Sequence, residues 1–111
     1  MIKPSDPRVL AVDLLPRSIC SVQVAAVISD GAGIFSWGWN SVGDGWGIHA
    51  EAHAIRRANK RRLRGSTIYV ASQRMRNEKT IRSKPCDDCQ ALIDKWGLSV
   101  LYRDPNDTWI A

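Results

Sequence analysis

Two short segments of the sequence carry residue types that can bind a metal ion. The first holds His49 two positions before Glu51, and the second holds Cys86 and Cys89 directly after a proline. Cysteines three positions apart on the first turn of a helix point the same way, so both sulfurs can reach one ion. A helix N-terminus also favours the thiolate form. One imidazole and two thiolates therefore predict a Zn²⁺ site.

The number of ligands indicates a catalytic zinc ion. Three protein ligands (His49, Cys86 and Cys89) leave a fourth position for water, whereas structural zinc sites usually have four protein ligands. A catalytic zinc lowers the pKa of that water towards about 7. Glu51 would lie next to the water without being a ligand, which is where a carboxylate can accept a proton and pass it on. The spacing therefore predicts Glu51 as the catalytic acid and base.

Two further residues are alternatives for a fourth ligand, which would make the site structural. His53 follows His49 by four positions on the same face of the expected helix, and Cys20 is the third cysteine. The alternative interpretations are a packed or substrate-facing histidine and a small apolar core residue, respectively. A redox role for the C-x-x-C pair would leave the H-x-E segment unused.

The elements that must position these residues alternate between strands and helices. The first two strands are expected to form an antiparallel hairpin with a glycine-bearing turn. The strands on either side of the last helix should be parallel, joined by a right-handed crossover. We therefore expect an α/β sandwich around a mixed sheet, with both metal-binding segments at helix N-termini. In chain order the expected elements are a helix between 5 and 16, strands at 22–28 and 34–39, a helix from 49 to just before 65, a strand at 67–71, a helix from 85 to 96, a strand at 98–102 and a short edge strand around 109.

Length and composition are those of one globular domain, which we expect to span residues 1–111. The apolar fraction of 44% is ordinary for such a domain. No apolar run approaches the roughly 20 residues that cross a bilayer, and the N-terminus lacks the apolar stretch of a secretion signal. We therefore expect no membrane partner and a cytoplasmic location, which for a phage-encoded chain is the host cytoplasm.

The net charge of +5 and the pI near 9.5 favour a phosphorylated or polyanionic partner, although a basic surface can also serve solubility alone. Arg74 and Arg76 are candidate substrate contacts, because their cluster leads directly to the cysteines. Trp46, three residues before His49, is a candidate for stacking on a base. The two basic clusters are Arg56, Arg57, Lys60, Arg61, Arg62 and Arg64, and Arg74, Arg76, Lys79, Arg82 and Lys84.

The pattern H-x-E followed by P-C-x-x-C resembles the cytidine deaminase superfamily. Gly38-Trp39-Asn40 is similar to the family's G-x-N stretch, in which the asparagine contacts the ribose, and His49-Ala50-Glu51 matches its H-A-E form. The likeness covers roughly residues 20 to 103. It implies a three-layer α-β-α fold with a sheet of four to five strands, a zinc-dependent hydrolase, and substrate contacts from Asn40 and the backbone N–H of Ala50.

The resemblance implies hydrolytic removal of the amino group at C4 of cytosine or C6 of adenine, with Glu51 protonating the ring nitrogen and then the amine. About ten basic and polar residues before Pro85 depart from compact free-nucleotide deaminases and look more like phage or bacterial-toxin deaminases. We therefore expect conversion of cytosine to uracil, with single-stranded DNA or RNA favoured over a free nucleotide.

Other functions stay open from the sequence. One is a free nucleoside or nucleotide deaminase acting on cytidine or deoxycytidylate, and a second is an adenosine deaminase. A third, of another class, is a non-catalytic zinc-stabilised module that binds nucleic acid. Members of the superfamily commonly form dimers or tetramers, so a homo-oligomer is a further alternative.

Overall fold

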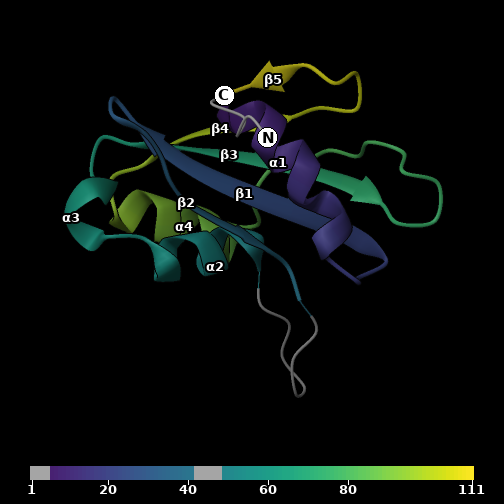
Figure 1. Ribbon diagram of the computed structural model, residues 1–111, viewed down its shortest axis with the longest axis horizontal. Coiled ribbons are helices and arrows are strands. Elements are labelled where there is room, and N and C mark those ends of the chain that lie inside the picture. The colour runs from purple at the N-terminus through teal and green to yellow at the C-terminus, as the bar shows by residue number, and fades with distance from the viewer. Residues whose placement is uncertain (1–5, 42–48) are drawn as a thin grey trace, which may run out of the picture.

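The structure is a computed structural model that describes residues 6–41 and 49–111 (Figure 1). Within these residues a five-stranded sheet has the order β2-β1-β3-β4-β5. Only the pair β3 and β4 is parallel there, and the other neighbours are antiparallel. The expectation of a mixed sheet is therefore confirmed. The strands are β1 (Val22–Asp30), β2 (Gly33–Trp39), β3 (Thr67–Arg74), β4 (Ser99–Arg103) and β5 (Trp109–Ile110).

Helices cover both faces of this sheet, which gives the expected three layers (Figure 1). On one face lies α1 (Pro7–Leu14), continued by the 3₁₀ turn η1 (Leu15–Arg17). On the other face lie α2 (Ala50–Arg57) and α4 (Asp87–Lys95). Each face has its own apolar core, because side chains on a strand alternate between the two faces.

The prediction of one continuous helix between His49 and Gly65 is wrong, because the helix is interrupted near its middle. The chain leaves helical geometry at Ala58, whose ψ is 151°, and a short helix α3 (Lys60–Leu63) follows. The Asn59 side chain caps α3 by accepting a hydrogen bond from the Arg61 N–H at 3.0 Å. An asparagine that bonds to nearby backbone favours such a cap over a helix interior, which accounts for the break.

Helix α2 is fixed against the sheet edge by a hydrogen bond from a strand side chain. The Ser36 hydroxyl on β2 donates to the backbone oxygen of Ala54 at 2.6 Å. This bond joins the middle of β2 to the second half of α2 and holds the helix against the edge strand. Among the described residues, no helix is long and apolar enough to cross a membrane.

Candidate metal centre and active site

Three candidate metal ligands from two helix N-termini meet at one point. His49 immediately precedes α2, Cys86 immediately precedes α4, and Cys89 lies on the first turn of α4. The Nδ1 atom of His49 is 3.5 Å from the Cys86 sulfur and 3.3 Å from the Cys89 sulfur. The three ligand atoms all lie within 4.8 Å of one another. Tetrahedral zinc spaces such ligand atoms roughly 3.5–3.8 Å apart, so the residues fit this ion.

The electrostatics around Cys89 also fit a cation. Burial of Cys89, followed by the nearby negative charge of Glu51, raises the pKa of its thiol well above the usual range. A thiolate at this position therefore needs a positive charge beside it, and a divalent ion supplies one.

The Glu51 carboxyl is buried beside this centre. Only 5% of the residue is exposed. Burial raises the pKa of its carboxyl, since the charged form loses its hydration. A carboxyl with a raised pKa is better suited to exchange protons near neutral pH.

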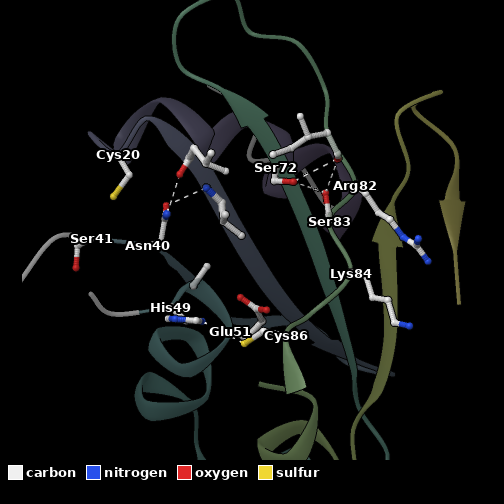
Figure 2. Close-up of a pocket in the computed structure, with 14 residues that line it drawn as sticks. Cys20, Asn40, Ser41, His49, Glu51, Ser72, Arg82, Ser83, Lys84 and Cys86 are labelled. Atoms are coloured by element: carbon white, nitrogen blue, oxygen red, sulfur yellow. Dashed lines mark hydrogen bonds between the residues drawn. The ribbon is translucent and has the colours of Figure 1, made fainter. Parts of the chain in front are cut away.

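A cavity of about 370 Å³ opens next to the metal ligands, and Figure 2 shows His49, Glu51 and Cys86 along one side of it. This volume is in the range of small-molecule sites. The start of β1, the end of β2, the N-terminus of α2 and the segment before α4 form its walls. The described lining residues include Cys20, Val22, Val24, Asn40, Ser41, Ala50, Ser72, Ile81, Arg82, Ser83 and Lys84.

Asn40 and Ala50, both predicted as substrate contacts, line this cavity. The Oδ1 atom of Asn40 already accepts hydrogen bonds from the Ser18 hydroxyl at 2.7 Å and the Val24 N–H at 2.9 Å. Its Nδ2 atom donates to the Val22 carbonyl at 2.8 Å. The carboxamide thus joins the end of β2 to the start of β1 and keeps one N–H for a ligand.

Two serines of the cavity wall were missed in the sequence. Ser72 on β3 and Ser83 before α4 are both buried, and their hydroxyl oxygens lie 2.7 Å apart. A signal for Ser72 existed, because it continues the face of β3 that holds Ile68 and Val70 and interrupts that apolar alternation. No comparable pattern pointed to Ser83.

The basic loop before α4 reaches the cavity with other residues than those predicted. Arg74 and Arg76 are exposed and do not line the cavity, whereas Arg82 and Lys84 do. Figure 2 shows the charged ends of Arg82 and Lys84 extending away from Glu51. Trp46, the predicted stacking residue, lies outside the described residues.

The alternative fourth ligands do not join the metal-binding group among the described residues. The Nδ1 atom of His53 lies 3.1 Å from the carbonyl oxygen of Trp39, and the two rings pack edge to face. His53 is therefore a packed histidine. Cys20 is partly exposed on the cavity wall, so it is not the core residue that was expected as an alternative.

The basic cluster of α2 and α3 has local structural partners. Lys60 donates to three carbonyl oxygens at the end of α2, the shortest bond being 2.7 Å to Ile55. Arg62 forms a two-bond ion pair with Asp30 at 2.8 and 2.9 Å. Figure 1 shows α3 at the opposite end of the molecule from the loop between β3 and α4.

In this mixed-sheet fold, two helix N-termini bring an H-x-E segment and a C-x-x-C segment to one point. This arrangement is that of a zinc-dependent deaminase site. The family model described as "Cytidine and deoxycytidylate deaminase zinc-binding region" matches residues 9–102. The chain belongs to this family.

Solved structures of such enzymes share the fold. The dCMP deaminase of cyanophage S-TIM5 is 25% identical with a TM-score of 0.55, over 73% of this chain and 65% of that one. This chain thus spans slightly less than two thirds of the phage enzyme. The cytidine deaminase of Burkholderia pseudomallei is 20% identical with a TM-score of 0.67, over 86% and 80% of the chains. That of Mycobacterium leprae is 18% identical with a TM-score of 0.62, over 92% and 88%. No curated protein matches the chain.

Proposed function

We propose that this protein hydrolyses the amino group of cytosine to give uracil in a cytidine or deoxycytidine substrate. The observation that carries the proposal is the meeting of three metal ligands with a buried carboxyl, that of Glu51, beside one cavity. A zinc ion held by His49, Cys86 and Cys89 would supply a Lewis acid that lowers the pKa of water.

The chain's own residues then have defined tasks. Glu51 accepts a proton from the attacking water, whose oxygen bonds to C4 of the base. The same carboxyl delivers this proton to ring nitrogen N3, and it transfers the second water proton to the amino group. The C4–N bond breaks and ammonia leaves. The free N–H of Asn40 and the backbone N–H of Ala50 orient the nucleoside in the cavity.

The similarity of this chain to known deaminases favours cytosine as the base. The matching family model is described by cytidine and deoxycytidylate, and the phage enzyme of 25% identity is a dCMP deaminase. An adenine-containing substrate belongs in the same assay as a competing candidate.

We propose further that the substrate carries phosphate and that single-stranded nucleic acid is its preferred form. In the part of the chain that the structure describes, the ion pairs involve Arg8, Arg62 and Arg103, so the basic loop keeps its charges for a ligand. This loop offers more cations than one phosphate needs. They are Arg74, Arg76, Lys79, Arg82 and Lys84, all exposed.

Free deoxycytidylate is the second candidate. Lys60 and Arg62 are engaged with the protein itself, which removes part of the charge that a long strand would contact. Salt separates the two forms: turnover of a strand should weaken steeply between low and moderate salt, and turnover of deoxycytidylate should weaken far less.

The test is turnover by the zinc-loaded protein on cytidine, deoxycytidylate, single-stranded DNA and RNA oligomers, and adenosine equivalents. Glu51→Gln is the matched variant, and we expect it to retain zinc and to lose turnover. Turnover that survives in Glu51→Gln would contradict the mechanism. If the wild type binds strands but deaminates none of these compounds, the protein is a zinc-stabilised binding module and the proposal is wrong.

A further inference from the structure

A buried arginine without a catalytic task lies at the end of β4. Arg103 is only 7% exposed, and its Nε atom has no hydrogen-bond partner among the described residues. Its nearest carboxylate is that of Asp107, which is exposed and lies 3.9 Å from Nη1. Burying a cation with such weak pairing costs free energy, because few hydrogen bonds or opposite charges replace its lost hydration.

Besides its backbone pairing with Trp109 on β5, Arg103 contacts residues close to both ends of the loop of residues 75–84, which joins β3 to the cysteine segment. Its Nη2 atom lies 3.4 Å from the carbonyl oxygen of Ser72, near the start of the loop. The main-chain carbonyl oxygen of Arg103, independently of the guanidinium, accepts the Ser83 N–H at 3.1 Å near the end of the loop. Ser72 and Ser83 are the two residues whose hydroxyls meet in the cavity wall.

The middle of the loop is tied to the same place through Asp107. The Thr80 hydroxyl donates to the Oδ1 atom of Asp107 at 2.7 Å, the same oxygen that faces the Arg103 guanidinium. Asp107 has a left-handed φ of 63° in the turn between β4 and β5. The Asp107 carboxylate, in the turn between β4 and β5, thus connects the loop to Arg103.

We propose that Arg103, acting through Asp107 and Thr80, is a positioning residue that holds the loop wall of residues 81–84 against the cavity. It does not line the cavity, so its effect on a substrate passes through the loop residues that do, Ile81 to Lys84. A wall that is held in place keeps its groups in contact with the bound substrate, and the loss of such uniform binding raises KM while kcat stays the same. The kinetic part of this inference rests on the proposed function.

Thr80 provides the sharpest kinetic test. Thr80→Val keeps the shape of the side chain and removes the bond to Asp107, whereas Thr80→Ser keeps the hydroxyl. For the best substrate of the wild type, we expect Thr80→Val to raise KM up to roughly tenfold, the scale of one lost hydrogen bond, with kcat and zinc content unchanged. Thr80→Ser should restore the wild-type KM.

Arg103→Met tests the arginine itself, with Arg61→Met on exposed α3 as the control for loss of a positive charge. We expect Arg103→Met to raise KM, and the double variant with Thr80→Val to raise it by less than the product of the two single effects. The effects of substitutions that break the same chain of contacts are not additive. Independent, fully multiplicative effects would overturn the link through Asp107.

Limited digestion with trypsin gives a readout that needs no activity. The loop region contains Arg74, Arg76, Lys79 and Arg82 as cleavage positions, while Lys84 precedes a proline and resists cleavage. If Arg103 holds the loop, Arg103→Met and Thr80→Val should be cut there faster than the wild type and Arg61→Met.

The outcomes separate this inference from the proposed function. Faster cleavage with a raised KM supports the positioning role. Unchanged cleavage and unchanged KM overturn it, as does a lower thermal midpoint with neither change, because Arg103 would then only stabilise the fold. If the wild type deaminates nothing, the proposed function fails, and the cleavage comparison still decides whether Arg103 holds the loop.

Discussion

Gly38 on β2 approaches α2 so closely that a Cβ atom at Gly38 would lie 2.7 Å from the backbone nitrogen of Ala54. The same atom would lie 2.8 Å from Cβ of His53. Helix α2 begins at Ala50, next to the metal ligands, so this contact sets how deeply the start of the helix, including Glu51, sits against the sheet. A glycine here is a requirement of packing between strand and helix.

Gly38→Ala should therefore destabilise the protein by about 1–3 kcal/mol, the usual cost of overpacking a tight contact. Because the backbone of α2 must move, zinc affinity should fall as well. Urea denaturation and a zinc titration measure the two effects. Gly31→Ala is the matched control, since a Cβ atom at Gly31 meets nothing within 4 Å. Equal losses in the two variants would show that the close approach is not the cause.

Removal of one thiolate should remove the metal. Cys89→Ser replaces a buried candidate ligand with a poorer one, so we expect the purified protein to hold far less zinc and to melt at a lower temperature. A chelator should lower the melting temperature of the wild type and leave that of Cys89→Ser nearly unchanged, because only bound metal adds stability.

Cys20→Ser is the control for this experiment, because Cys20 lies on the cavity wall outside the group of metal ligands. It should keep the zinc content of the wild type. Elemental analysis of both variants, purified side by side, makes the comparison. Equal zinc loss in Cys20→Ser would point to a different set of ligands.

The ion pair of Asp30 with Arg62 predicts a defined dependence of stability on pH. Hydrogen bonds from the Arg62 guanidinium lower the pKa of the Asp30 carboxyl from 3.8 to about 2 in the folded state. A carboxyl with a depressed folded pKa stabilises the fold above its unfolded pKa and loses this contribution as the pH falls through the folded value.

Asp30→Asn should therefore be less stable than the wild type at pH 7, and the difference should shrink below pH 3.8 and vanish near pH 2. Melting temperatures of both proteins across this range test the prediction. A difference that stays constant down to pH 2 would mean that the ionised carboxylate contributes nothing. The pair is partly exposed, so added salt should reduce the difference at pH 7.

The sequence by itself determined the class of fold and the chemistry of the centre. The H-x-E and C-x-x-C segments could be recognised as metal-binding in the sequence, because the spacing of ligands on the first turn of a helix is a local property of the backbone. The strands and α1 were readable for the same reason, since caps and the period of apolar residues act over a few positions. A family pattern then connected the two segments.

Beyond the residues of the family pattern, the tertiary structure decided which polar residues surround the cavity. Ser83 reaches Ser72 only because a loop without periodicity returns to the end of β3, and Arg103 contacts both only through the pairing of β3 with β4. The basic clusters show the same limit. Lys60 and Arg82 look alike in the sequence, yet one caps a helix and the other lines the cavity. The sequence pattern around a long charged side chain does not indicate its partner. The partner depends on which groups the fold places within reach of that side chain.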